Sequence, residues 1–365
     1  MARVARPQYV RAMDEYTEPG AVSVAADDNA VAALLDRGRA APGHTAMAFR
    51  DGDRFVDVST ADVVARCREL AAGLVGLGIE PGDRVAVFMK TRIEFTYLDY
   101  AIWMAGATTV TIYETSSADQ VEWIVGDSGA VALVCGNAEL RRRFDEIAER
   151  TPDCRHVFVA DDGGLDEIAS AGADVTGQQV DDRIAAIAHD DPATLVYTSG
   201  TTGRPKGCVI THGNLIWEVR QVVTKTQDLF TPDNATLMFL PLAHILARVV
   251  QVGCVSRGVT IGYSTGIAQL VPELSLLRPT WVFAVPRVFE KVYNTAQGQA
   301  GEGIQRTIFD RATETAIEYS RQKTSGSVDL KTRVQHAVFD KLVYGKLRAA
   351  FGGRLAFAIS GGAPL

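Results

Sequence analysis

The sequence predicts an α/β protein built on doubly wound parallel sheets. A helical pattern at 62–77 is followed by a strand at 84–89, a buried helix at 95–105 and a β-branched strand at 108–113. Short apolar strands that alternate with helices are typical of βαβ units, and such units form parallel sheets. The alternation therefore predicts the fold class.

Each element follows from the spacing of apolar residues and from turn residues. The first helix has apolar residues three and four positions apart and is expected to stop at Gly78, before the turn Glu-Pro-Gly-Asp. A loop-rich stretch at 161–182 then leads into a second α/β series. We expect two subdomains, 1–185 with the N-terminal segment and 186–365. The further strands are expected at 130–135, 156–160, 194–198, 235–241, 259–262 and 281–285, with a helix at 121–126.

Composition limits the class of protein. Apolar residues make up 47% of the 365 residues, charged residues 22%, and the net charge is −7, so no basic field exists and nucleic acid is not an expected partner. The five cysteines form no CxxC pair, which argues against a disulfide framework or a zinc site. Neither a signal peptide nor an apolar run of membrane-spanning length is visible. These features favour a cytoplasmic protein.

A basic helical insertion is expected at about 301–354, within the second subdomain. It holds ten Lys and Arg and six Asp and Glu, which gives +4 against −11 for the remainder. An apolar stripe at helical spacing lies beside the basic residues. The pattern favours a helix docked on the core with a solvated basic side; the alternative is an interfacial face that meets anionic lipid or a phosphorylated substrate. The stripe comprises Val334, Val338, Leu342, Phe339, Val343 and Leu347.

The most informative segment is 195–207, Leu-Val-Tyr-Thr-Ser-Gly-Thr-Thr-Gly-Arg-Pro-Lys-Gly. It begins as an apolar strand and passes into small, hydroxylic and glycine residues. Glycines let the backbone approach an anion, consecutive N–H groups can form a phosphate-binding nest, and a lysine adds a point charge. The candidate phosphate-binding residues are Thr198, Ser199, Gly200, Thr201, Thr202, Gly203 and Lys206.

The obvious alternative for this segment is a Walker A loop, which its spacing excludes. Pro205 precedes the lysine where the Walker motif has glycine, and Gly207 follows it where the motif has serine or threonine. A purely structural turn would not need four hydroxyls and a lysine within ten residues. A phosphate loop of another kind is therefore expected.

The segment 197–207 resembles the signature loop of the adenylate-forming superfamily, which includes acyl- and aryl-CoA synthetases, peptide-synthetase adenylation domains and luciferases. Further similar segments are 78–87, 239–245 around His244, and 360–365. The segment 285–293, Val-Pro-Arg-Val-Phe-Glu-Lys-Val-Tyr, is similar to long-chain fatty-acyl-CoA synthetases. The resemblance implies the large N-terminal domain of these enzymes, made of two doubly wound αβα subdomains.

The resemblance also implies a reaction and its site. ATP and a long-chain fatty acid would give acyl-AMP and pyrophosphate, and the CoA thiol would then attack the acyl carbon. The loop would hold the β- and γ-phosphates of ATP, Thr198 would help to place Mg²⁺, and Lys206 and His244 would be the catalytic residues. The adenine would be held by Gly361, Gly362, Ala363 and Pro364.

The family's later motifs are not found in this sequence. These are an acidic Tyr-Gly-x-Thr-Glu, a Thr-Gly-Asp, a hinge and a small C-terminal domain with the adenylation lysine. We therefore expect an N-terminal part with little or no turnover by itself. Two alternatives stay open: a fatty-acyl-AMP ligase that delivers to a carrier protein, and a non-catalytic nucleotide- or lipid-binding module. A peripheral membrane contact through 301–354 is a further hypothesis.

Overall fold

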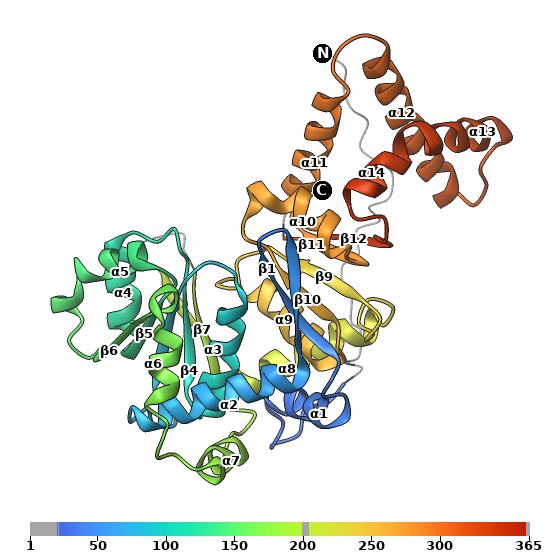
Figure 1. Cartoon of the computed structure of the whole chain (residues 1–365). Coiled ribbons are helices and arrows are strands. Elements are labelled where there is room, and N and C mark those ends of the chain that lie inside the picture. Colours follow the sequence, from blue (N-terminus) through green and yellow to red (C-terminus); the bar gives the residue numbers. More distant parts are fainter. Residues whose placement is uncertain (1–19, 21, 199–203, 363–365) are drawn as a thin grey trace, which may run out of the picture.

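The computed structural model describes residues 20, 22–198 and 204–362, and it contains two six-stranded sheets that lie side by side (Figure 1). The predicted α/β fold with parallel sheets is confirmed. In the first sheet all neighbours are parallel except the last pair. Its strands, in spatial order, are β6 (His156–Val159), β5 (Ala130–Cys135), β3 (Arg84–Phe88), β4 (Thr108–Ile112), β7 (Pro192–Thr198) and β8 (Lys206–Thr211).

Helices cover both faces of the first sheet because successive side chains of a strand point to opposite faces. Val85 and Val87 of β3 belong to the apolar cluster of one face, and Ala86 and Phe88 belong to the cluster of the other. The first face carries α2 (Thr60–Gly76), α3 (Ile93–Met104), α6 (Gly164–Ser170) and α7 (Gly177–Ala185); the second carries α4 (Ala118–Ser128) and α5 (Ala138–Asp145).

The second sheet is parallel except for a hairpin at its edge. Its strands, in spatial order, are β12 (Phe357–Ser360), β11 (Trp281–Ala284), β9 (Ala235–Met238), β10 (Thr260–Tyr263), β1 (Thr45–Asp51) and β2 (Arg54–Ser59). The associated helices are α1 (Ala32–Ala40), α8 (His212–Lys225), α9 (Ile245–Arg257) and α10 (Leu270–Leu277).

The strands of both sheets cross the expected division at residue 185. The β1–β2 hairpin precedes that residue but pairs with β10, with Met47 opposite Ile261. The β7–β8 hairpin follows it but belongs to the first sheet. Each sheet therefore contains one hairpin from the other side of residue 185. The division into subdomains 1–185 and 186–365 stays a prediction.

A buried ion pair connects the two halves of the molecule. Arg248 of α9 and Asp99 of α3 are both fully buried, and Nη2 of the arginine lies 2.8 Å from Oδ1 of the aspartate. The guanidinium also lies 5.5 Å from the ring centre of Trp103. Burial raises the pKa of Asp99 and lowers that of Arg248, because each charge has lost its water. The pair therefore ties α9 to the helix that follows β3.

A helical arm projects away from both sheets between β11 and β12 (Figure 1). Within the arm, Val334, Val338 and Leu342 are exposed by 56%, 49% and 52%. The interpretation of this stripe as docked on the core is therefore wrong for these three residues, whereas its other members, Phe339, Val343 and Leu347, are half-buried. No described helix is both long and apolar enough to span a bilayer. The segment comprises α11 (Pro286–Gln299), α12 (Ile304–Thr324), α13 (Leu330–Phe339), a π-helical stretch (Asp340–Tyr344) and α14 (Gly345–Ala350).

Candidate functional site

The phosphate loop is the connection of the β7–β8 hairpin. In this antiparallel pair Thr198 lies directly opposite Lys206, so the two residues form the mouth of the loop, and both are exposed. Among the residues that the structure describes, the Thr198 hydroxyl lies 3.9 Å from Sγ of Cys208, a weak contact. The structure thus brings together two of the predicted residues. The others, Ser199, Gly200, Thr201, Thr202 and Gly203, lie outside the described residues.

The far side of the loop is anchored on α4, which the sequence reasoning did not connect with it. The indole Nε1 of Trp123 donates a hydrogen bond to the carbonyl oxygen of Pro205 at 2.8 Å. The guanidinium of Arg204 lies 4.6 Å from the centre of the same ring, within cation–π range. Nothing in the sequence links position 123 to position 205, since 82 residues separate them.

The strand before the loop is held on the same helix. The hydroxyl of Tyr197 donates to Oδ2 of Asp127 at 2.6 Å, and burial together with this carboxylate raises the pKa of the tyrosine. Gly207 lies against the tyrosine ring, where a Cβ would come within 3.0 Å of Cζ. A side chain at 207 would therefore require the tyrosine ring to move by a few tenths of an ångström.

His244 begins helix α9 and is exposed. Its Nδ1 accepts a hydrogen bond from the backbone N–H of Leu246 at 3.2 Å, which caps the helix. Because Nδ1 accepts, the neutral imidazole carries its proton on Nε2 and presents a donor to the solvent. The amino end of α9 also favours negative charge at this position. A carboxylate oxygen is the kind of group that this arrangement can bind.

The segment before His244 is fixed between the sheets by two threonines. Thr91, which follows β3, donates to the carbonyl oxygen of Leu240 at 2.7 Å and accepts from the N–H of Leu242 at 2.8 Å. Thr111 of β4 donates to the carbonyl oxygen of Ala243 at 3.0 Å. The position of His244 is therefore set by hydrogen bonds to the carboxyl ends of two strands of the first sheet.

Gly361 and Gly362 follow β12 and lie beside the start of α9. The N–H of Gly361 donates to the carbonyl oxygen of Ala284 at 3.3 Å, and Gly362 has a φ of 76°, which favours glycine. A Cβ on Gly362 would lie 3.7 Å from Cδ2 of Leu246. Ala363 and Pro364 lie outside the described residues.

The two groups of predicted residues meet at one edge of the fold. Thr111, which holds the carbonyl of Ala243, is the register partner of Val196, two residues before Thr198. The phosphate loop and the His244 segment thus both lie at the carboxyl ends of parallel strands. In open α/β sheets ligands bind at these ends.

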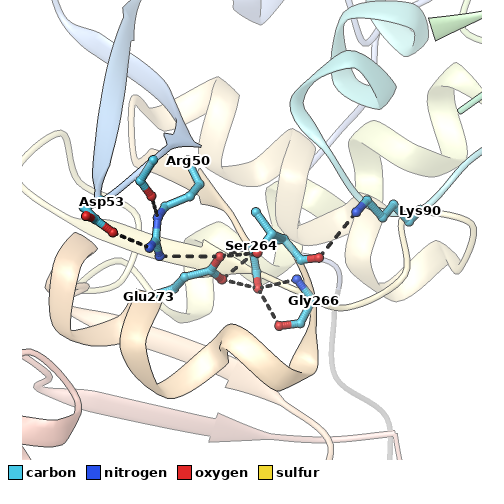
Figure 2. A network of polar contacts seen from close by, with 8 residues as sticks. Arg50, Asp53, Lys90, Ser264, Gly266 and Glu273 are labelled. Atoms are coloured by element: carbon cyan, nitrogen blue, oxygen red, sulfur yellow. Dashed lines mark hydrogen bonds and ion pairs between the residues drawn. The ribbon is translucent and has the colours of Figure 1, made fainter. Parts of the chain in front are cut away.

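A separate open cavity of about 480 Å³ lies at the ends of β3, β5 and β10, and none of the predicted site residues lines it. Figure 2 shows the polar contacts beside this cavity: the buried Glu273 accepts from the backbone and the hydroxyl of Thr265, while Arg50 approaches the same carboxylate at 4.0 Å. Lys90 donates to the Thr265 carbonyl at 3.4 Å. Arg92 in the lining pairs with Glu94 and Asp161, whereas Lys90 reaches, among the described residues, only this backbone carbonyl. The cavity lies between strand ends of the two sheets.

The described residues contain no group of three or more His, Cys, Asp or Glu that could hold a metal ion. The hydroxyl of Thr198 would supply one oxygen ligand. That fits Mg²⁺, which is commonly held by one or two protein oxygens, water and the phosphates of a bound nucleotide.

A comparison with protein families matches residues 34–365 to the model for the AMP-binding enzymes. The chain belongs to this family. It is 42% identical over 356 residues to the long-chain-fatty-acid–CoA ligase FadD15 of Mycobacterium tuberculosis, covering 97% of this chain and 59% of that protein. It is 31% identical to the peroxisomal long chain acyl-CoA synthetase 7 of Arabidopsis thaliana, covering 81% of this chain and 43% of that protein. The chain thus spans about three fifths or less of these relatives.

Solved structures agree with the fold. The inhibitor-bound N-terminal domain of FACL13 from Mycobacterium tuberculosis superposes with a TM-score of 0.63 at 27% identity, covering 72% of this chain and 64% of that one. The long-chain-fatty-acid–CoA ligase FadD1 of Archaeoglobus fulgidus gives a TM-score of 0.67 at 22% identity, covering 77% and 56%. The predicted resemblance to the long-chain branch of adenylate-forming enzymes is therefore confirmed.

Proposed function

We propose that this chain is the nucleotide- and acyl-binding part of an AMP-forming long-chain fatty-acid–CoA ligase. Such an enzyme converts ATP and a fatty acid to acyl-AMP and pyrophosphate, and then transfers the acyl group to CoA. The names and the 42% identity of the relatives support the substrate class. The observation that carries the proposal is the position of Thr198 directly opposite Lys206 at the mouth of the loop. The neighbouring strand β4 holds the His244 segment through Thr111.

The first step brings two anions together, so the site must offset their repulsion. Lys206 would neutralise charge on the β- and γ-phosphates as pyrophosphate leaves, and the N–H groups of the loop would add hydrogen bonds. The Nε2–H of His244 and the amino end of α9 would orient the carboxylate toward the α-phosphorus. Mg²⁺, with the Thr198 hydroxyl among its ligands, would neutralise further phosphate charge. The segment that begins at Gly361 would lie against the adenine.

A binding experiment on this chain separates these roles. Two probes are titrated by calorimetry in the presence of Mg²⁺: a β,γ-imido analogue of ATP, and a sulfamoyl analogue of acyl-AMP with a C16 chain. Only the first carries β- and γ-phosphates. Lys206→Ala should therefore weaken the ATP analogue about tenfold or more, the range for a lost charge-assisted contact. The acyl-adenylate analogue should bind Lys206→Ala as tightly as the original chain.

The matched control is Lys323→Ala, an exposed lysine on the helical arm with the same change in charge. It should leave both affinities unchanged. An equal loss of both probes in Lys206→Ala, or a loss of neither, would contradict the role given to this lysine. Sulfamoyl analogues from C2 to C16 test the acyl class, since affinity that does not rise with chain length would rule out a long-chain site.

The acceptor is tested in the longer protein. A CoA ligase releases the acyl-CoA ester when CoA is added, whereas a fatty-acyl-AMP ligase accumulates acyl-AMP until a carrier protein is supplied. Binding of both probes without any fatty-acid-dependent release of pyrophosphate would favour the non-catalytic binding module.

A further inference from the structure

The helix that runs from 330 to 350 in the arm exposes a continuous aliphatic stripe. Leu330 is exposed by 77%, and Val334, Val338 and Leu342 by about half. The first three are four residues apart in α13, so they lie on one face of the helix. At 1.5 Å per residue the stripe is about 18 Å long. Exposed apolar rows of this length on a helix indicate a surface that binds something.

This exposure does not come from a loosely held helix, because the other face is anchored on α12. The rings of His336 and Tyr319 stack with centres 4.0 Å apart, and the hydroxyl of Tyr344 donates to the carbonyl oxygen of Ala312 at 2.6 Å. Asp329 caps the first turn by accepting from the N–H of Thr332 at 2.8 Å. The helix is therefore held in one orientation with its aliphatic stripe outward.

Basic side chains border the stripe. Lys331 precedes Val334 by three residues, Lys341 follows Val338 by three, and both are exposed, as is Lys346. Within the described part of the arm none of these lysines makes an ion pair, whereas Arg348 pairs with Asp340 at 2.7 Å. The range 330–350 contains five basic residues and one acidic residue, in a protein with a net charge of −7. Glu314 and Glu318 of α12 share a groove with Val334 and Val338, together with Arg311, so the positive charge lies on the helix 330–350 itself. A partner that complements this helix is both apolar and negatively charged.

We propose that this stripe and its basic border bind the surface of a bilayer that contains anionic lipids. Aliphatic side chains on one face of a helix, flanked by lysines whose stems reach along the apolar surface, match an interfacial helix that lies in the membrane plane. Valine and leucine would enter the region between headgroups and acyl chains. The lysines would contact lipid phosphates. This interaction is independent of the proposed reaction and needs no turnover to be observed.

The test is sedimentation of this chain with vesicles of phosphatidylcholine alone or with 30% phosphatidylglycerol. The chain should bind the anionic vesicles, bind the neutral ones much more weakly, and lose binding as NaCl rises. The double variant Lys331→Glu/Lys341→Glu should lower the partition constant more than tenfold, since a single lysine near such a surface is worth about fivefold. Val334→Ser/Val338→Ser removes the apolar contact without changing charge, and should lower it by a similar factor.

The matched control is Arg142→Glu/Arg155→Glu, two exposed arginines outside the arm with the same change in net charge. It should keep most of the binding. Equal binding to neutral and anionic vesicles, no binding to either, or unchanged binding of the two arm variants would each overturn the proposal. A dimer in analytical ultracentrifugation that Val334→Ser/Val338→Ser dissociates would show instead that a second copy covers the stripe.

Discussion

Charged side chains are usually exposed and apolar ones buried, and helix α9 and the arm helix at 330–350 each depart from one half of this rule. The first buries a charged side chain completely, that of Arg248, and the second leaves a row of valine and leucine in water. The difference follows from their surroundings. α9 packs between elements of both sheets, and its charge meets Asp99 across the junction. The arm helix packs with one face on α12, and its last turn meets α10, where the hydroxyl of Ser275 donates to the carbonyl oxygen of Ala350.

This contrast indicates which parts of the molecule must be rigid for the site to exist. His244 is the first-turn cap of α9, and Arg248 lies one turn further along the same helix. The ion pair that fixes the helix therefore also fixes the imidazole. The arm contributes no residue to the predicted site, so its surface is free to serve a different interaction.

The largest expected effect is that of Arg248→Met, which leaves the buried carboxylate of Asp99 without its partner. Removing one member of a buried ion pair costs about 3–5 kcal/mol of unfolding free energy. Urea unfolding at pH 7 measures the loss. The variant should regain part of its stability at lower pH, because protonation neutralises the aspartate, whose pKa burial already raises.

A double-mutant cycle sharpens this result. Asp99→Asn/Arg248→Met removes both charges, so it should be less destabilised than the two single variants together. Simple additivity of the two losses would contradict the interpretation of the pair as coupled charges. Lys331→Met on the arm removes an exposed charge and should change stability by no more than about 0.5 kcal/mol.

The next effect concerns His212, at the start of α8 and buried beside α3. Its Nδ1 accepts from the N–H of Ala30 at 3.2 Å, its ring meets the edge of Trp103, and burial lowers its pKa to about 4. The unfolded chain, with a pKa near 6.5, therefore binds this proton more readily than the folded one. Stability should fall as pH drops from about 6.5 to 4, by up to about 3 kcal/mol.

Unfolding free energies measured by urea titration between pH 8 and 4 test this, with His212→Phe as the variant that cannot titrate. Its curve should be flatter over this range even if its stability at pH 8 is lower. His336→Phe, on the arm, is the matched control and should retain the slope of the original chain. An unchanged slope in His212→Phe would show that other groups cause the acid sensitivity.

The sequence predicted those parts of the fold that local patterns specify. Apolar runs gave β3, β4 and β5 within one residue of their observed ends, and β-branched residues marked the same strands. The pairing of β1 with β10 was not predictable, because it joins residues more than 200 positions apart. Strand β8 was also missed: Lys206 and Gly207 were assigned to the end of the phosphate loop, and 208–211 were assigned to no strand. Non-local pairing decides both cases.

The sequence predicted only those site residues that belong to a recognisable short motif. Thr198, Lys206, His244 and Gly362 all came from short motifs, and the roles assigned to them stay predictions. Trp123, which fixes the loop through Pro205, has no motif, and an aromatic residue within a helix is usually part of the core. In the arm, the sequence identified the residues but not their surroundings. Helical periodicity found its apolar stripe, but periodicity does not say whether anything covers it.

The smallest effect tests this last point through two matched valines. Val252 of α9 is 3% exposed and Val334 of the arm is 56% exposed. Val252→Ser should cost about 3 kcal/mol, because it loses a buried side chain and buries a hydroxyl. Val334→Ser should change the unfolding free energy by no more than about 0.5 kcal/mol, since water already contacts the side chain. Thermal unfolding of both variants at several protein concentrations gives the comparison. A cost for Val334→Ser that approaches that of Val252→Ser, and that grows with protein concentration, would mean that a second copy buries the stripe, because only association makes stability depend on concentration.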